Sequence, residues 1–424
     1  MLDQRVDTSA SRRPTSGLPV AAVLRVGAYQ RLLLSGLSIN IARWMDMVAL
    51  GWVALQLTDS PFMVGLAAFA RSAPMMALGP FTGVVADRIP RARVLLITQS
   101  VGMATGLTLA LLFATGHGSY GALVVLATFF GALWALDFPA RRTALYAVVG
   151  PSRVATAMSV DTVSMQLARM AGPLLAGLAL ARLGPAACFA GVAVMYAIGL
   201  AMVLGLRSRI GTPAPARSTS VVATLGTAFA AVWRDQTVRA VLVITVLMNV
   251  LYFPYQHMLP VFARQVLAIG PEGLGALVAA NGLGALLGAL AIASRRGFVP
   301  HRRLFAMSVI ISPILLVGLA SLRWRWSCLI ALLIIGAAES GFAAMQSTIM
   351  LLSTPEEIRG GAMGILSACI GTGPLGALWI GFLAAGTGAA LAMALSSVVA
   401  LALMLPVAIP LARRVGRTAP WTGR

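Results

Sequence analysis

Apolar stretches of about 20 residues follow one another along almost the whole chain, separated by short polar or Gly/Pro-rich segments. A helix of that length crosses the hydrocarbon core of a bilayer, where every backbone polar group must find its partner inside the segment. Charged residues make up only 10% of the chain, and a soluble domain usually carries about 25%. The pattern predicts an all-α polytopic membrane protein and excludes a soluble globular domain.

Hydropathy predicts twelve spans, at 32–57, 62–86, 93–115, 119–140, 156–181, 185–206, 238–262, 273–293, 303–321, 326–350, 362–385 and 388–411. The longest interruption contains Pro213 and Pro215 and has the composition of a linker. Part of it, 221–234, is basic and amphipathic and is expected to lie along the membrane surface. We therefore expect a tail at 1–31, a six-helix bundle at 32–206, a linker at 207–237, a second six-helix bundle at 238–411 and a tail at 412–424.

Arginine placement predicts the orientation, because basic residues collect in cytoplasmic loops. All 32 basic residues are arginines, and with both termini inside, only Arg182, Arg264, Arg323 and Arg325 fall on the outer side. The net charge of +20 then belongs to these loops and not to a nucleic-acid surface. The chain is expected in a bacterial inner membrane, with both termini cytoplasmic.

The two halves repeat each other at an offset of roughly 205 residues. Gly79-x3-Gly83 corresponds to Gly284-x3-Gly288, and Gly172-Pro173 corresponds to a Gly-Pro pair at 373–374. Internal duplication of this kind is common in transporters, where the substrate site lies near the midplane between the repeats.

Residues 83–93 read GVVADRIPRAR. The segment resembles the major facilitator signature G-x-x-x-D-R-x-G-R-[RK], with proline and alanine replacing a glycine and a basic residue. The matching positions are Gly83, Asp87, Arg88 and Arg91. Residues 136–142 and 168–173 resemble the branch of that superfamily that contains the enterobactin exporter and macrolide efflux proteins.

The resemblance implies two pseudo-symmetric six-helix bundles that alternate access, usually moving a solute outward in exchange for protons. It implies that Asp87 latches the halves at the cytoplasmic face and that Asp137 completes this cluster with Arg88 or Arg91. Gly172, Pro173 and Gly177 resemble an antiporter motif ending G-P-x-x-G-G, in which Ala176 replaces a glycine. The implied partners are a small-molecule substrate, protons and membrane lipid, and the implied state is a monomer.

Ionisable residues inside spans are costly and mark functional positions. Arg43 and Asp46 lie one turn apart, so they can form a static ion pair, or Asp46 can exchange protons. Glu339 has no cation within a turn, which favours a proton carrier; the alternatives are a pair with Arg43, Arg71 or Arg169, or a packing role.

Further cavity candidates are polar residues at helical spacing. Asn249, Tyr252 and Gln256 share one predicted face of the seventh span, and Gln346 follows Glu339 by two turns; Asn40 lies one turn before Arg43. Such a stripe suits a bulky amphipathic ligand, although interhelical hydrogen bonding explains it equally well.

The chain contains neither a P-loop nor a nucleophile motif, so we expect no enzyme and no ATP-driven pump, and no metal or cofactor site. The leading interpretation is a proton-coupled exporter of an amphipathic small molecule. An importer or facilitator of the same fold and a non-transporting membrane sensor are the alternatives.

Overall fold

The computed structural model describes residues 20–206, 233–294, 301–355 and 358–413, apart from the side chains at 78–88 and 360. Residues 1–19 and 414–424 of the expected tails, and 207–232 of the expected linker with most of the 221–234 segment, lie outside these residues. Most of 20–31, expected in the first tail, is helical instead. Within them, the secondary structure is helical throughout. The first helices are α1 (Val20–Leu24), α2 (Gly27–Thr58), α3 (Pro61–Arg88), α4 (Arg91–Ala114), α5 (Tyr120–Val149), α6 (Val154–Arg182) and α7 (Gly184–Leu204).

The later elements begin with an interrupted run made of α9 (Gln236–Leu247), η1 (Met248–Tyr252), α10 (Tyr255–Val261) and η2 (Phe262–Val266). They continue as α11 (Pro271–Ala293), α12 (His301–Ser321), α13 (Arg325–Ser353), α14 (Arg359–Ile370), α15 (Gly373–Thr387) and α16 (Ala389–Arg413). Local signals fix several ends: the Asp235 carboxylate accepts hydrogen bonds from two N–H groups that open α9, and Gly388, at φ +80°, ends α15.

Ten stretches of the described chain are long and apolar enough to cross a membrane, which makes this a multi-pass membrane protein. The two expected spans outside this set are α2 and α3, which have 32 and 28 residues. α2 carries Arg43 and Asp46 within its length.

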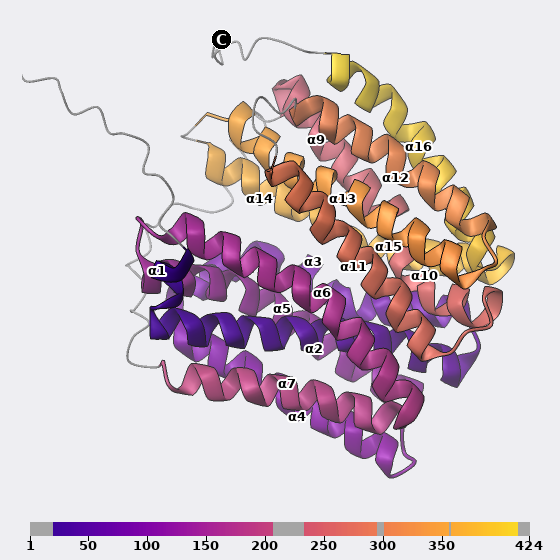
Figure 1. The fold of residues 1–424 in the computed structure, drawn as a ribbon, viewed down its shortest axis with the longest axis horizontal. Coiled ribbons are helices and arrows are strands. Elements are labelled where there is room, and N and C mark those ends of the chain that lie inside the picture. The colour runs from indigo at the N-terminus through magenta and orange to yellow at the C-terminus, as the bar shows by residue number, and fades with distance from the viewer. Residues whose placement is uncertain (1–19, 207–232, 295–300, 356–357, 414–424) are drawn as a thin grey trace, which may run out of the picture.

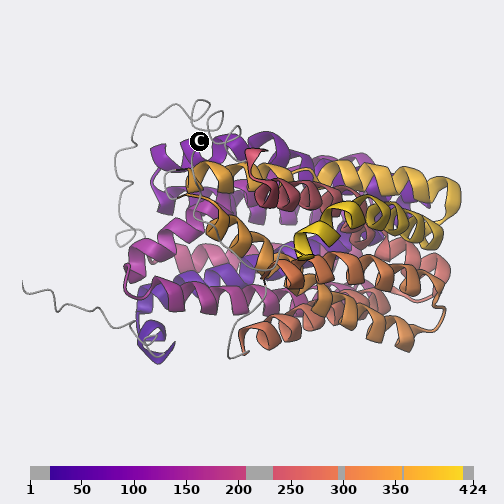
Figure 2. The same cartoon turned by 90° about the horizontal axis from the view of Figure 1, so that it is seen from above.

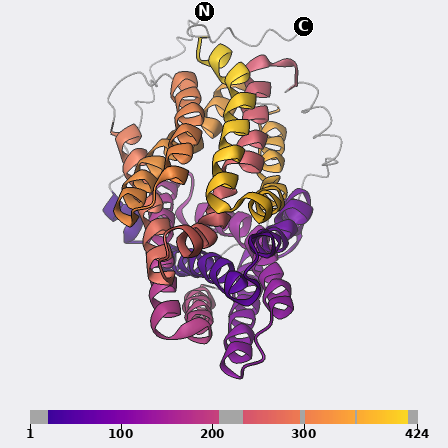
Figure 3. The same cartoon turned by 90° about the vertical axis from the view of Figure 1, so that its right-hand side faces the viewer.

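Figure 1 shows α2, α4 and α7 on one side of the molecule and α9, α12 and α16 on the other, with α6 and α11 between them. Seen from above, the long helices run in roughly the same direction (Figure 2). The end-on view separates the earlier helices from the later ones (Figure 3). The most extensive contacts between the two groups are made by α6 with α11 and by α3 with α15.

Glycines permit these two contacts. A Cβ added to Gly177 of α6 would lie 2.6 Å from the carbonyl oxygen of Pro271 and 3.2 Å from the Cα of Gly275 in α11. In the other contact, a Cβ added to Gly65 of α3 would lie 2.8 Å from the Cα of Gly381 in α15. Small residues let membrane helices approach to backbone contact, so these four glycines set how closely the two groups meet.

The fourth expected span, 119–140, runs on to Val149 in α5, and the seventh departs from a regular helix. It extends from Gln236 to Val266, beyond the predicted end at 262, and includes two π-helical segments. Pro254 stands in the break between η1 and α10, where it lacks an N–H to continue the helix. π-Helical turns add a residue per turn and frequently occur at functional sites, and they shift the faces that a regular helix would present.

Candidate functional site

Glu339 lies at the centre of a buried polar network. Its Oε2 is 3.2 Å from Nη2 of Arg169 in α6, and its Oε1 accepts hydrogen bonds from the hydroxyls of Tyr252, at 3.1 Å, and Tyr255, at 2.8 Å. Asn281 of α11 donates from Nδ2 to Glu339 Oε2 and to the Tyr255 hydroxyl. The carboxylate therefore has a cation from the earlier helices and neutral donors from the later ones, which is what a buried charge needs.

A second buried carboxylate lies in α2. Asp46 Oδ2 accepts a 2.6 Å hydrogen bond from Nε of Arg71 in α3, and Arg71 Nη2 also reaches the Arg43 carbonyl oxygen at 3.4 Å. The expected local pair between Arg43 and Asp46 is thus replaced by a pair between helices. The short Arg71 bond satisfies Asp46 and leaves the Arg43 side chain to other neighbours.

Those neighbours are aromatic. The Arg43 guanidinium lies 3.9 Å from the ring centroid of Trp134 in α5 and 5.8 Å from that of Trp44. On the Trp44 ring it is joined by Arg169, at 5.4 Å. Guanidinium groups bind indole faces by cation–π attraction. The two carboxylate centres are therefore linked through Arg43, Trp44 and Arg169.

Three amide residues predicted to line a cavity make hydrogen bonds away from the two carboxylate centres. Asn40 is buried and donates to the Gly36 carbonyl oxygen at 2.8 Å. Asn249 donates to the Thr245 carbonyl oxygen, and Gln346 donates to the Thr245 hydroxyl at 2.6 Å. These amides are satisfied within or between helices.

The residues predicted to share a face of the seventh span have different neighbours. Tyr252 faces Glu339 of α13, whereas Gln256 lines a cavity of about 20 Å³ with Arg71 and other residues of α2 and α3. The π-helical segment and the break at Pro254 interrupt the regular helical spacing between these two residues.

Asp137 of α5, which was expected to pair with Arg88 or Arg91, has an ion-pair partner on its own helix. Nε and Nη2 of Arg141, one turn further along α5, each lie 3.0 Å from the Asp137 carboxylate, and Thr98 donates to it at 3.2 Å. Arg91 opens α4. The side chains of Gly83, Asp87 and Arg88 lie outside the described residues, so their predicted latch remains an expectation.

Two ion pairs join the groups at the edge where the glycine contacts lie. Arg264 of η2 is 2.9 Å from the Asp59 carboxylate and donates to the Leu55 carbonyl oxygen at 3.0 Å. Arg182, at the end of α6, is 2.8 Å from Glu272 of α11. The antiporter-like motif contributes to the same packing, because Gly177 meets α11 and Gly172 meets α2.

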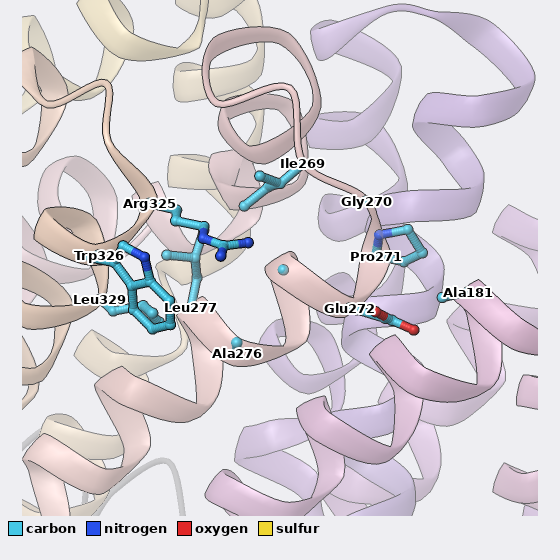
Figure 4. Close-up of a pocket in the computed structure, with 11 residues that line it drawn as sticks. Ala181, Ile269, Gly270, Pro271, Glu272, Ala276, Leu277, Arg325, Trp326 and Leu329 are labelled. Atoms are coloured by element: carbon cyan, nitrogen blue, oxygen red, sulfur yellow. The ribbon is translucent and has the colours of Figure 1, made fainter.

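A cavity of about 550 Å³ opens at this edge, between the end of α6 and the beginnings of α11 and α13. Figure 4 shows Arg325 beside Trp326 on one wall and Glu272 on another. Its lining contains none of the residues that make the Glu339 and Asp46 centres. We therefore place the candidate functional site at those centres and not in the cavity.

Sequence reasoning missed two residues of the Glu339 centre. Asn281 was overlooked, although an amide within the glycine- and leucine-rich run of α11 is itself a costly polar residue in a span. Tyr255 lies next to the predicted face of the seventh span but is not part of it. The same rule that selected Glu339, a polar group in an apolar run, was sufficient to find Asn281.

A family model described as a transmembrane secretion effector matches residues 19–419. The multidrug efflux pump Tap of Mycolicibacterium fortuitum is 26% identical over 367 residues, covering 84% of this chain and 89% of that protein. The enterobactin exporter EntS of Salmonella choleraesuis is 25% identical over 360 residues, covering 82% and 85%. A staphyloferrin A transporter of Staphylococcus aureus is 22% identical over 279 residues, covering 66% and 70%.

Solved structures share the fold. A POT family transporter in complex with 5-aminolevulinic acid superposes with a TM-score of 0.73 at 12% identity, covering 92% of this chain and 96% of that one. A bacterial homologue of the human lysosomal transporter Spinster, in an inward-facing and unoccupied conformation, gives 0.69 at 14% identity, covering 91% and 97%. At such identities the likeness concerns the fold alone.

Proposed function

The chain belongs to the transmembrane secretion effector family of major facilitator transporters, and on that premise we propose that it exports an amphipathic small molecule by proton antiport. Two relatives, a multidrug efflux pump and an enterobactin exporter, favour the outward direction. The exchange would follow alternating access between the halves 32–206 and 238–411, joined by the 207–237 linker.

The observation that carries the proposal is the ion pair between Arg169 and Glu339. It joins the two halves at a carboxylate that is only 4% exposed. A buried carboxylate that loses its cation is strongly destabilised unless it gains a proton. Movement of α6 away from α13 would therefore couple separation of the halves to protonation of Glu339.

Asp46 is the second proposed proton site. Its pair with Arg71 lies entirely within the first half, so relative movement of the halves need not break it. Arg43 has its guanidinium on the aromatic rings, and it could reach Asp46 in another state. We assign Glu339 the coupling role and Asp46 a supporting one.

The proposed topology has twelve spans, made of the ten long apolar stretches together with α2 and α3. Both termini would be cytoplasmic in a bacterial inner membrane, and the transporter would act as a monomer. Pseudo-symmetry is supported by the glycine contacts: Gly65 and Gly275, like Gly177 and Gly381, are separated by nearly the repeat offset of about 205.

The test is substrate-induced proton release from everted vesicles that hold a pH gradient, with dyes, macrolides and siderophores as the panel. We expect release with at least one compound in the wild type and none in Glu339→Gln. The matched control is Asp235→Asn, which makes the same acid-to-amide change at the N-cap of α9, where asparagine caps as well as aspartate.

Full proton release by Glu339→Gln would refute the coupling role. Uptake of the panel compound against the proposed direction would favour the importer or facilitator of the same fold. The absence of release and of flux with every compound, from protein shown to be inserted, would refute export and favour the non-transporting sensor.

A further inference from the structure

The central cluster has one more cation than its carboxylates can neutralise. Asp46 is paired with Arg71, and Glu339 is paired with Arg169. Among the side chains that the structure describes, no carboxylate lies within ion-pair distance of Arg43. An unpaired charge within a membrane span is costly, so this position requires an explanation that the two ion pairs do not provide.

The surroundings of Arg43 leave its hydrogen-bonding edge available. Trp134 covers a face of the guanidinium at 3.9 Å, and Trp44 lies at 5.8 Å. Stacking engages the faces of a guanidinium, whereas carboxylates and phosphates bind its N–H edge in a bidentate fashion. Arg43, Trp44 and Trp134 are all partly exposed although they lie within long helices, so their side chains are not fully enclosed by the packing.

Arg169 supplies a second donor beside the same ring. Its Nη2 serves Glu339 and Asn281, but its buried Nε–H has no hydrogen-bond partner. Buried donors without partners are rare in proteins and call for an explanation such as a missing ligand. This donor and the Arg43 guanidinium both lie against Trp44.

We propose that Arg43, with Trp44 and Trp134, forms a binding site for an anionic amphipath whose carboxylate or similar oxyanion lies beside an aromatic or apolar body. The oxyanion binds the Arg43 edge, and the apolar body lies against the two indoles. This inference rests on the proposed export function and deepens it, because it names the charge class of the substrate.

The competing explanation is that Arg43 serves as a reserve partner for Asp46 or Glu339 in another conformation. That role predicts no preference for anionic ligands. It also predicts that removing Arg43 changes proton release equally for charged and neutral substrates. The two explanations are therefore separated by ligand charge, which an equilibrium binding measurement can vary alone.

The experiment measures binding of tritiated 2-naphthoate to the purified full chain in nanodiscs of zwitterionic lipid, by scintillation proximity. Unlabelled 2-naphthamide and 2-(aminomethyl)naphthalene compete as the neutral and cationic counterparts. We expect the wild type to prefer the carboxylate over the amide by about 10-fold, the ratio that a charge-assisted hydrogen bond provides.

Arg43→Gln should reduce that preference to about 1-fold, and Arg43→Lys should retain part of it because lysine keeps the charge but lacks the planar fork. Arg325→Gln is the matched control, since Arg325 also lies over a tryptophan, at 4.8 Å from the Trp326 ring, but at the exposed rim. It should keep the wild-type preference. A ratio of affinities within each variant does not depend on the folded fraction.

An unchanged preference in Arg43→Gln, a wild type that prefers the amine, or no specific binding of 2-naphthoate by the wild type would each overturn the inference. The proton-release assay judges the export function separately. Export of panel compounds with no charge preference would refute this inference and leave the function standing. Arg43-dependent binding of 2-naphthoate without flux of any compound would refute export and leave the Arg43 binding site standing.

Discussion

Replacing Gly177 by alanine is expected to force α6 and α11 apart at the edge where the two halves meet. The added Cβ would lie 2.6 Å from the Pro271 carbonyl oxygen, 3.2 Å from the Gly275 Cα and 3.3 Å from the Glu272 Cα. Favourable contacts begin near 3.5 Å, so α11 must retreat by roughly 0.9 Å. All three opposing atoms are backbone atoms, and no side-chain rotation can relieve the clash.

The cost falls only on the conformation in which this contact is closed. Overpacking by one methyl group typically costs about 1–3 kcal/mol, and the gain in helix propensity from glycine to alanine applies equally to both states. A differential cost of that size changes a conformational equilibrium by about 5–150-fold. The closed population should therefore fall, and the state with this edge open should become measurable.

The assay is the distance distribution between spin labels at Leu183 and Trp324, in a variant without the native cysteines. Both positions are well exposed, and they follow α6 and precede α13, one in each half. Gly177→Ala should shift the distribution to longer distances. The control is Gly318→Ala, within α12, where an added Cβ meets nothing within 4 Å.

The steric argument is refuted if Gly177→Ala gives the same distribution as the wild type. It is also refuted if the Gly318 control shifts the distribution as far, because the effect would then belong to helix stiffness and not to the contact.

Three further variants test ion pairs outside the central cluster. Asp137→Asn removes the ion-pair partner of the buried Arg141, and breaking a buried pair typically costs about 3–5 kcal/mol, so the apparent Tm should fall clearly. Glu272→Gln in its exposed pair should lower it little; equal shifts would contradict the burial argument. Arg264→Gln removes the pair with Asp59 and should lengthen the same spin-label distance at low salt more than at high salt; an effect that is independent of salt would assign the change to packing.

The positions of most helices follow from hydropathy, because span length is fixed by the bilayer and the boundaries are marked by Gly, Pro and Arg. The largest boundary errors concern the fourth span, which continues past its predicted end at 140 to Val149, and the seventh, which continues past 262 to Val266. Composition alone does not reveal π-helical turns, since these depend on which backbone bonds the neighbouring helices allow. Pro254 did indicate where the break falls.

The identity of Glu339 as a central residue was predictable, since an acid in an apolar run must have a role. Its partner was left open among three arginines, and the structure selects Arg169, 170 positions away. Sequence spacing does not determine how helices from different halves are rotated toward each other. Only packing decides which of several buried cations meets a given carboxylate.

For Asp46, helical spacing pointed to a partner on the same helix. Helical spacing makes Arg43 a possible partner, but the observed partner is Arg71 in the next helix. Helical spacing shows which groups can meet. In the structure the Arg43 guanidinium lies instead against the Trp134 ring. This contact depends on an aromatic residue of α5 that no local pattern connects to α2.

The contact at Gly177 has a mechanical consequence. The glycine lies near one end of α6, so the start of the helix at Val154 is about 34 Å away at 1.5 Å per residue. A tilt of roughly 10° about that contact would displace the start by about 6 Å. With the glycine contact as its pivot at one membrane face, α6 is a long lever, and a small change of tilt there becomes an opening of several ångströms at the other face.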